Sequence, residues 1–75
     1  MTAIRFDITD PHGETEVDNG MLSSPPTQTA QQDAQHIADD FPSGWTVRLW
    51  KDVPLYGSLA DLGQPHAVAV SSQQS

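Results

Sequence analysis

Alternating hydrophobic and polar residues mark two segments of the chain as β-strands with one buried face. In residues 3–9, Ile4, Phe6 and Ile8 alternate with polar side chains, which is the period of a strand with one wet face. Residues 45–51 alternate as cleanly and are rich in aromatic and β-branched residues. They are therefore expected to form a central strand.

The segment after the first strand predicts a hairpin whose second strand is weak. Residues 10–13 read Asp-Pro-His-Gly, a turn sequence in which proline presets φ and glycine ends the turn. Residues 14–18 then return, but they carry three acids and one strongly apolar residue, which favours an edge strand. Asn19 and Gly20 form a turn signal that is expected to end this strand.

One amphipathic helix is expected in the middle of the chain. Its apolar positions repeat with helical spacing and are Ala30, Ala34, Ile37, Ala38 and Phe41. Thr29 followed by Gln32 fits a capping box, with Thr27 as the alternative cap. Pro42 and Gly44 are expected to stop the helix.

The last third of the chain predicts a second hairpin, followed by a segment for which the sequence allows two structures. A turn at 52–54 leads into a shorter strand over 55–59, and 60–63 are expected to close one helical turn. Residues 66–70 fit either a last strand or an ordered flap. Residues 71–75 are expected to be a disordered tail.

Together these elements predict an α+β fold, a small antiparallel sheet in the order β-β-α-β-β with one helix packed on one face. Residues 1–63 are expected to form a single compact domain, followed by a C-terminal segment over 64–75. The expected core consists of Ile4, Phe6, Ile8, Val17, Ala34, Ile37, Ala38, Phe41, Trp45, Val47, Leu49 and Leu55. The opposite face is expected to be largely open to water and to carry Arg5, Asp7, Thr46, Arg48, Trp50 and Tyr56.

The size of the chain limits what it can build. Its 75 residues allow one domain with a thin core, in which a deep catalytic cleft is difficult to form. It has no cysteine, which excludes disulfides and thiolate metal sites and fits a reducing cytoplasm. No signal peptide or transmembrane helix is visible in the sequence, so we expect a soluble cytoplasmic protein.

Charge is the strongest compositional feature. Ten acids face three bases, giving a net charge of −7. Such a chain is not expected to bind DNA, RNA or an anionic membrane directly, because the phosphates would repel it. The charge has two readings, which are plain solubility and attraction toward a basic surface on a partner protein.

Residues typical of catalysis or of metal binding do not form a recognisable pattern. The three histidines, His12, His36 and His66, are not spaced as metal ligands, and no nucleophile or phosphate-loop motif occurs. The acid pairs at 14/16 and 39/40 could act as general acid and base, but nothing places them in a desolvated pocket. We therefore expect no enzyme activity, no catalytic residue, no cofactor and no metal.

The first functional hypothesis uses the carboxylates, since on a compact scaffold they can stand in for phosphates. The proposed partner-binding acids are Asp7, Asp10, Glu14, Glu16, Asp18, Asp39 and Asp40. In architecture and charge the chain resembles the small phage-encoded inhibitors of host defence, including anti-CRISPR proteins, although the likeness covers no specific positions. It implies a DNA mimic that blocks the basic, nucleic-acid-binding surface of a host protein complex.

The second hypothesis is a small regulatory or accessory domain that docks through Arg48, Trp50 and Tyr56 on the open sheet face, because aromatic residues and arginine are enriched at interface hot spots. A homodimer through the same face is a further option. Alternatively, Trp50 stacks on Arg48 or is covered by the chain after residue 58. A virion or toxin–antitoxin component is a third reading, although the basic segment that antitoxins usually carry is missing.

Overall fold

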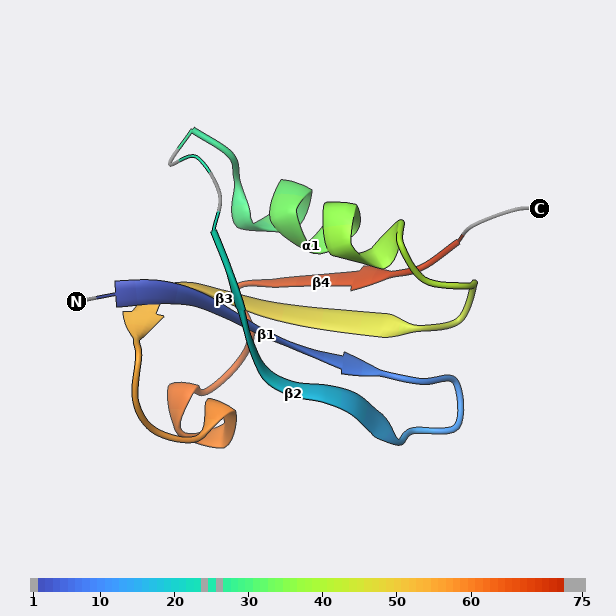
Figure 1. Cartoon of the computed structure of the whole chain (residues 1–75), viewed down its shortest axis with the longest axis horizontal. Helices are drawn as coiled ribbons and strands as arrows, with labels where there is room; N and C mark the ends of the chain where they lie inside the picture. Colours follow the sequence, from blue (N-terminus) through green and yellow to red (C-terminus); the bar gives the residue numbers. More distant parts are fainter. Residues whose placement is uncertain (1, 24, 26, 73–75) are drawn as a thin grey trace.

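The computed structural model describes residues 2–23, 25 and 27–72. It has the α+β class expected from the sequence, with one α-helix and a four-stranded antiparallel sheet in the order β2-β1-β3-β4 (Figure 1). The elements follow one another as β1 (Thr2–Thr9), β2 (Thr15–Leu22), α1 (Ala30–Ala38), β3 (Thr46–Pro54), the 3-10 helix η1 (Leu59–Leu62) and β4 (Ala67–Val70). The helical turn expected at 60–63 is present as η1, but the expected order of elements is not matched in full, because the strand expected at 55–59 is absent and the last strand lies at Ala67–Val70.

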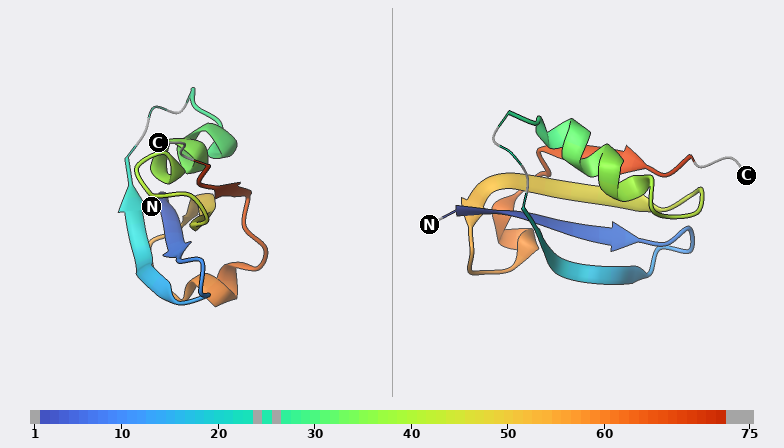
Figure 2. Two further views of the ribbon diagram at one scale, coloured as in Figure 1. Left: turned by 90° about the vertical axis from the view of Figure 1, so that its right-hand side faces the viewer. Right: turned by 45° about the horizontal axis from the view of Figure 1, so that its top comes forward.

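Helix α1 begins as the sequence predicts. The hydroxyl of Thr29 accepts a hydrogen bond from the Gln32 backbone N–H (3.1 Å), and the Gln32 side-chain oxygen accepts one from the Thr29 N–H (3.0 Å). This reciprocal capping box satisfies two backbone donors that the first helical turn leaves open. The buried apolar face of the helix, with Ala34, Ile37 and Ala38, packs on β3 and β4, and Figure 2 shows it covering one face of the sheet.

The main core lies between α1 and the sheet. Its buried residues are Ile4, Ile8, Ala34, Ile37, Ala38, Val47, Leu49, Ala67 and Ala69. The half-buried residues packed against it are Phe6, Val17, Leu22, Ala30, Phe41 and Trp45. Of the residues expected in the core, Leu55 belongs to neither hydrophobic cluster formed by the described residues. Ala67 and Ala69 come instead from β4, so the last strand is an integral part of the sheet.

The end predicted for the second strand at Asn19 and Gly20 is wrong, because β2 continues to Leu22. The pairing with β1 shifts by one residue between the Phe6–Gly20 and Ile8–Val17 pairs, which is a β-bulge. Asn19 sits in this bulge with a φ of 58°, a conformation that asparagine adopts more easily than most residues. The residues Asn19 and Gly20 therefore form a bulge inside the strand and not a turn at its end.

The predicted turn at 52–54 and strand over 55–59 are also wrong. Strand β3 runs on to Pro54 through a second bulge, where Asp52 has a φ of 58° and the pairing with β1 shifts. The chain then forms a loop and the 3-10 helix η1 before β4 pairs with β3. Residues 71 and 72 follow β4. The rest of the expected tail, residues 73–75, lies outside the described residues.

A second, smaller cluster covers part of the face that was expected to be open. Trp50 and Val53 of β3 pack there with Leu59 of η1, and Leu62 lies against them. The indole N–H of Trp50 donates to the carbonyl of Gly63 (3.3 Å). In Figure 1 this η1 segment lies on the side of the sheet away from α1. The face opposite α1 is therefore covered around Trp50 by this second cluster, and it remains exposed at Val68 and Val70.

Candidate functional site

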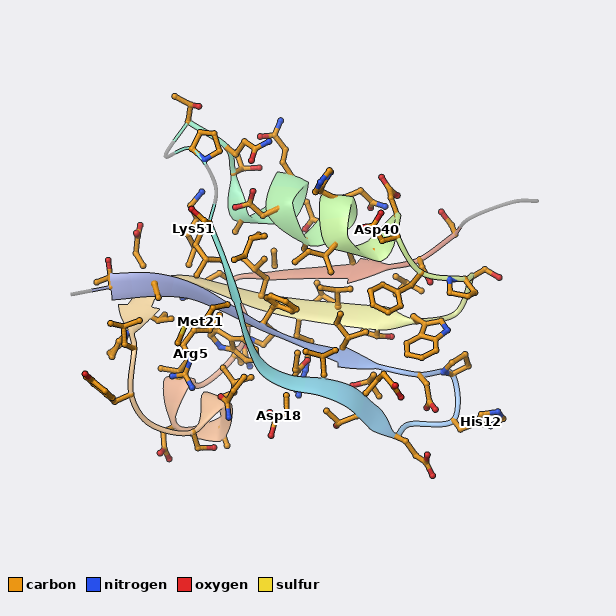
Figure 3. All side chains as sticks on the ribbon, in the orientation of Figure 1. Arg5, His12, Asp18, Met21, Asp40 and Lys51 are labelled. Carbon is orange, nitrogen blue, oxygen red and sulfur yellow. The ribbon has the colours of Figure 1, made fainter. Side chains whose placement is uncertain are left out.

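The β1–β2 hairpin carries a group of surface carboxylates, which we call the hairpin acids: Asp10, Glu14, Glu16 and Asp18. Asp10 has a structural task, since its carboxylate accepts hydrogen bonds from the backbone N–H groups of His12 (3.0 Å) and Glu14 (2.8 Å). These bonds fix the turn in the way typical of Asp at the start of a turn. Glu14, Glu16 and Asp18 are exposed, and Figure 3 shows Asp18 pointing away from β2.

The hairpin acids do not form the single strand face that simple alternation suggests. The pairing of β1 with β2 is irregular at two places, one next to Glu16 and one next to Asp18. Each irregularity interrupts the up-and-down alternation of side chains. Asp18 lines a groove on the open sheet face, while Glu14 precedes β2 altogether. The acids therefore spread around the β2 edge.

Asp39 and Asp40 lie at the C-terminal end of α1, where the helix dipole disfavours negative charge. The Asp39 carboxylate accepts a hydrogen bond from the Gln35 side-chain amide (3.0 Å). In Figure 1 this end of the helix and the hairpin turn lie at the same end of the molecule, and Figure 3 labels His12 and Asp40 there. The structure thus brings the helix-end acids to the same end as Asp10 and Glu14.

Asp7 does not belong to this exposed set. It is buried and forms a two-pronged ion pair with Arg48 of the neighbouring strand, in which Arg48 Nε lies 3.0 Å from Asp7 Oδ1 and Nη2 contacts Oδ2. This hydrogen bond, together with the attraction of the Asp7 and Asp18 carboxylates, raises the pKa of Arg48 above its ordinary value. The guanidinium also lies over the Trp50 ring, 5.6 Å from its centroid.

The aromatic docking face that the sequence suggested is not present as such. Trp50 is only 2% exposed, inside the second cluster, so the reading in which the chain after residue 58 covers it is correct. Tyr56 was expected across a hairpin from Trp50, but it lies in the loop after β3 and is 85% exposed. Arg48, Trp50 and Tyr56 therefore form no common exposed patch.

Arg5 has a role that the sequence did not indicate. It was placed on the wet face, yet it is buried and its guanidinium holds the loop around Tyr56. It donates to the carbonyls of Pro54 (3.2 Å), Tyr56 (3.3 Å) and Gly57 (2.6 Å) and to the Asn19 side-chain oxygen (2.5 Å). Its Nε has no hydrogen-bond partner among the described residues, which adds a desolvation cost to this arrangement.

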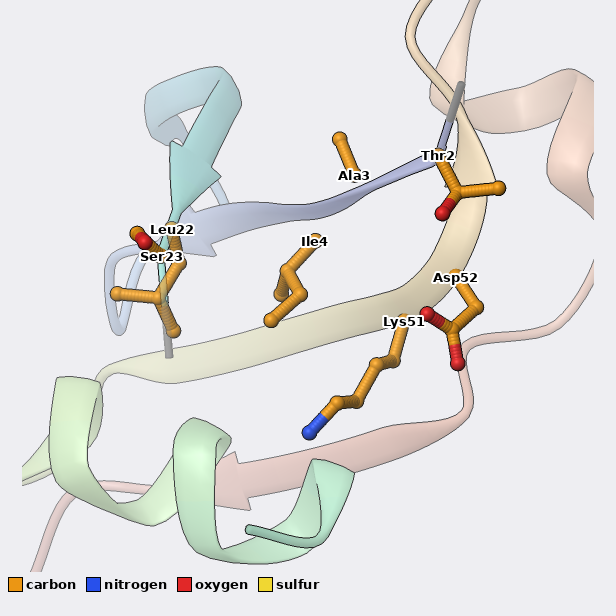
Figure 4. Close-up of a pocket in the computed structure, with 7 residues that line it drawn as sticks. All are labelled: Thr2, Ala3, Ile4, Leu22, Ser23, Lys51 and Asp52. Carbon is orange, nitrogen blue, oxygen red and sulfur yellow. The ribbon is translucent and has the colours of Figure 1, made fainter. Parts of the chain in front are cut away.

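Lys51 is the third base, and it too is used inside the fold. Its amine donates to the Gln28 carbonyl and lies 3.3 Å from a carboxylate oxygen of buried Asp33 in α1. Figure 4 shows Lys51 reaching toward the start of the helix from a hollow of about 260 Å³. The hollow is lined by Thr2, Ala3, Ile4, Leu22, Ser23, Lys51 and Asp52. Since the Lys51 amine is engaged elsewhere, Asp52 is the charged side chain that this hollow leaves exposed.

The fold thus separates the two signs of charge. Arg5 is bound to backbone carbonyls, Arg48 to Asp7, and Lys51 to Asp33. Asp7 and Asp33 are also the buried acids among the described residues. The exposed acids include Glu14, Glu16, Asp18, Asp40, Asp52 and Asp61. The described surface therefore presents several carboxylates, while each base is held by an internal partner.

A groove of about 250 Å³ runs along the open sheet face beside the second cluster. It is lined by Asp7, Thr15, Asp18, Arg48, Trp50, Ser58, Leu59, Ala60 and Gly63. Its arginine and its buried acid, Arg48 and Asp7, are paired with each other. Across the described part of the chain, no three His, Asp or Glu side chains converge as metal ligands. His66 accepts a hydrogen bond at Nδ1 from the Lys51 backbone N–H (3.0 Å).

Comparison with known proteins finds no matching family model, no similar curated protein and no similar solved structure. Among the residues that the structure describes, no helix has the length and apolar character needed to cross a membrane. The site is therefore defined by geometry alone. It comprises the hairpin acids, Asp39 and Asp40 at the same end of the molecule, and the exposed Tyr56 on its separate loop.

Proposed function

We propose that this chain is a non-enzymatic protein-binding module that docks its hairpin acids onto a basic, nucleic-acid-binding surface of another protein. This is the mode of action of the small phage-type inhibitors, anti-CRISPR proteins among them, that the chain resembles. The observation that supports it is the separation of charge. All three bases are engaged in internal hydrogen bonds, while Glu14, Glu16 and Asp18 are exposed. A basic surface would meet Glu14 and Glu16 without an internal ion pair to break, while Asp18 also faces Arg48.

The partner is expected to supply the lysines and arginines that normally contact phosphates. Such an interface would associate rapidly at low salt and weaken as salt screens the charges. Loss of one exposed charge pair changes binding by about 0.2–1 kcal/mol. Removing two hairpin carboxylates should therefore weaken binding by about twofold to thirtyfold.

The test is affinity capture from bacterial lysate with the immobilised chain, followed by elution with salt or with competing duplex DNA. A variant carrying Glu14→Gln and Glu16→Gln is compared with a control carrying Asp52→Asn and Asp61→Asn, which loses the same charge elsewhere on the surface. We expect DNA to displace a nucleic-acid-binding protein, and the hairpin variant alone to lose it. If both variants lost the captured protein to the same extent, binding would depend on the total charge and not on the hairpin acids. That result would overturn the proposal.

A second candidate function is docking through Tyr56 as a regulatory or accessory domain. It is favoured by one observation, that a tyrosine with 85% exposure sits on a loop fixed by three hydrogen bonds from buried Arg5. An exposed aromatic side chain on a backbone that is already fixed makes a good binding anchor, because less loop ordering is needed when it binds. Tyr56→Ala in the same capture discriminates the two functions. A salt-tolerant association lost only in this variant would replace the acidic mode with this one.

A further inference from the structure

The outer edge of β4 differs from the rest of the surface in carrying no charge. From residue 62 to residue 75 the sequence contains no Asp, Glu, Lys or Arg. Strand β4 is the last strand of the sheet, so half of its backbone groups point away from β3. The N–H of Ser71 donates to the carbonyl of Trp45, the residue just before β3 (2.7 Å). Because directions alternate along a strand, the N–H and C=O groups of Val68 and Val70 point outward.

The side chains next to this edge are apolar. Val68 is 45% exposed and Val70 is 55% exposed, and both stand on the sheet face opposite α1, since Ala67 and Ala69 face the core. Their neighbours across β3 are Arg48 and Thr46, and the Arg48 charge is met by Asp7. A strand pairing here would extend the sheet and cover two exposed valines.

Helix α1 places the amide side chain of Gln31 over the same edge, on a stripe that ends in one acid. The Gln31 side-chain amide donates to the outward carbonyl of Val68 (3.1 Å). Gln35 lies one turn further along the same stripe, and the next position is Asp39, whose carboxylate accepts a hydrogen bond from Gln35. Edge and helix together offer a surface of amide groups and valines in a chain that is otherwise strongly acidic.

We propose that a second copy of this chain docks at this surface, with the two β4 strands pairing antiparallel about a two-fold axis. The argument for a second copy is electrostatic. Two chains with a net charge of −7 each repel one another, and the uncharged β4 edge is where they can meet without placing carboxylates face to face. The pairing is self-complementary because Val68 and Val70 share one face of the strand, so an antiparallel pair about a two-fold axis can place Val68 of one copy beside Val70 of the other.

The symmetric arrangement has clear structural consequences. The two α1 helices would lie on the same side of an eight-stranded sheet, with the Gln31 and Gln35 stripes facing each other across the axis. The Val68 carbonyl already has Gln31 as a donor, so the outward groups of Val70 are the first that a second strand would meet. The two sets of hairpin acids would lie at the far edges, where they could engage two basic sites at once.

This inference does not rest on the proposed function, and salt separates the two. Binding of a basic partner weakens as salt rises, whereas pairing of two like-charged chains strengthens. The Debye length falls from about 30 Å at 0.01 M salt to about 8 Å at 0.15 M. Self-association should therefore increase over that range.

The experiment is sedimentation equilibrium of the purified full chain at both salt concentrations. We expect a monomer–dimer equilibrium that shifts toward the dimer at higher salt. Val70→Pro removes an outward N–H without breaking the ladder to β3, and Val68→Glu places two carboxylates near the axis. Each change acts twice in a symmetric dimer, so each should weaken dimerisation by about tenfold or more. Met21→Glu, which adds the same charge to an exposed position on β2, should have a much smaller effect.

Folding is checked by circular dichroism, so that a loss of dimer cannot be a loss of structure. A chain that stays monomeric up to about 1 mM at the higher salt would overturn the proposal. A dimer that tolerates Val70→Pro and Val68→Glu but is lost in Met21→Glu would also overturn it, because the interface would then lie at the β2 edge.

Discussion

The two edge strands of the sheet solve the problem of unpaired backbone in opposite ways. Strand β2 is eight residues long, interrupted by two pairing irregularities, and flanked by carboxylates. Strand β4 is four residues long, regularly paired and uncharged. Bulges and charge are both devices that discourage a second strand from pairing. The β2 edge has both devices. The β4 edge is protected only by its short length and by the Gln31 side chain, which donates to the Val68 carbonyl.

The two edges also differ in what they contribute to the core. On β4 the inward residues Ala67 and Ala69 are buried directly beneath α1. On β2 the inward residues Val17 and Leu22 are only half-buried at the margin of the same core. The acidic edge is therefore peripheral to stability, while the uncharged edge is central to it. The exposed charge therefore lies where the fold can carry it at little cost.

The sharpest way to test this contrast is to place a carboxylate on the inward side of each edge. Ala69→Asp puts an unpaired charge between β3 and α1, and should destabilise folding by more than about 3 kcal/mol. Val17→Asp can turn its carboxylate toward water and should cost about 1–2 kcal/mol. Urea unfolding followed by circular dichroism measures both. Equal costs would show that β2 is as integral to the core as β4.

Local features of the sequence predicted the helix correctly, because the forces that define it act over a few residues. The apolar stripe of α1 and the Thr29–Gln32 capping box both lie within the helix and its first turn. The alternation also identified the core-facing residues of β1 and β3, among them Ile8, Val47 and Leu49. It was wrong about the opposite face, where Arg5, Asp7 and Trp50 are buried. The class of the fold followed from these three elements.

The errors arose where a distant residue decides the local conformation. Asn19 and Gly20 form a turn in isolation, but here Gly20 lies opposite Phe6 across β1, and this pairing keeps the chain extended. Likewise, alternation correctly placed Trp50 on the face opposite the helix. It could not show that Leu59 and Leu62 fold back over it. Contacts that span ten or more residues leave no periodic signal.

The candidate site was predicted in part for the same reason. The exposed acids of the hairpin follow directly from their position in a weak edge strand. The pairing of Asp7 with Arg48 was missed, although both had been assigned to the same sheet face, and opposite charges on adjacent strands are a usable signal. The task of Arg5 had no signal in the sequence. Its partners are backbone carbonyls of a loop about fifty residues away.

A smaller effect is expected from the contact that keeps β2 in place. A Cβ atom added at Gly20 would lie 2.5–2.9 Å from the Phe6 ring, so Gly20→Ala must displace that ring. The cost should be about 1–3 kcal/mol, which for a domain of this size lowers the melting temperature by several degrees. Adding Phe6→Leu makes room, and the double variant should lose less than the sum of the two single changes. If the effects of the two changes on thermal unfolding simply added, the contact between the Phe6 ring and Gly20 would not be what holds β2 in place.

The smallest effect on folding should come from the acids themselves. Glu14 and Glu16 are exposed and form no ion pair with the bases of the chain, so changing both to glutamine removes no internal contact. The free energy of unfolding should change by less than about 0.5 kcal/mol, and any change should be toward greater stability, because like-charge repulsion on the hairpin is relieved. Urea unfolding at low salt measures it. A loss above 1.5 kcal/mol would mean that these carboxylates support the fold, and that the same variant could not report on binding alone.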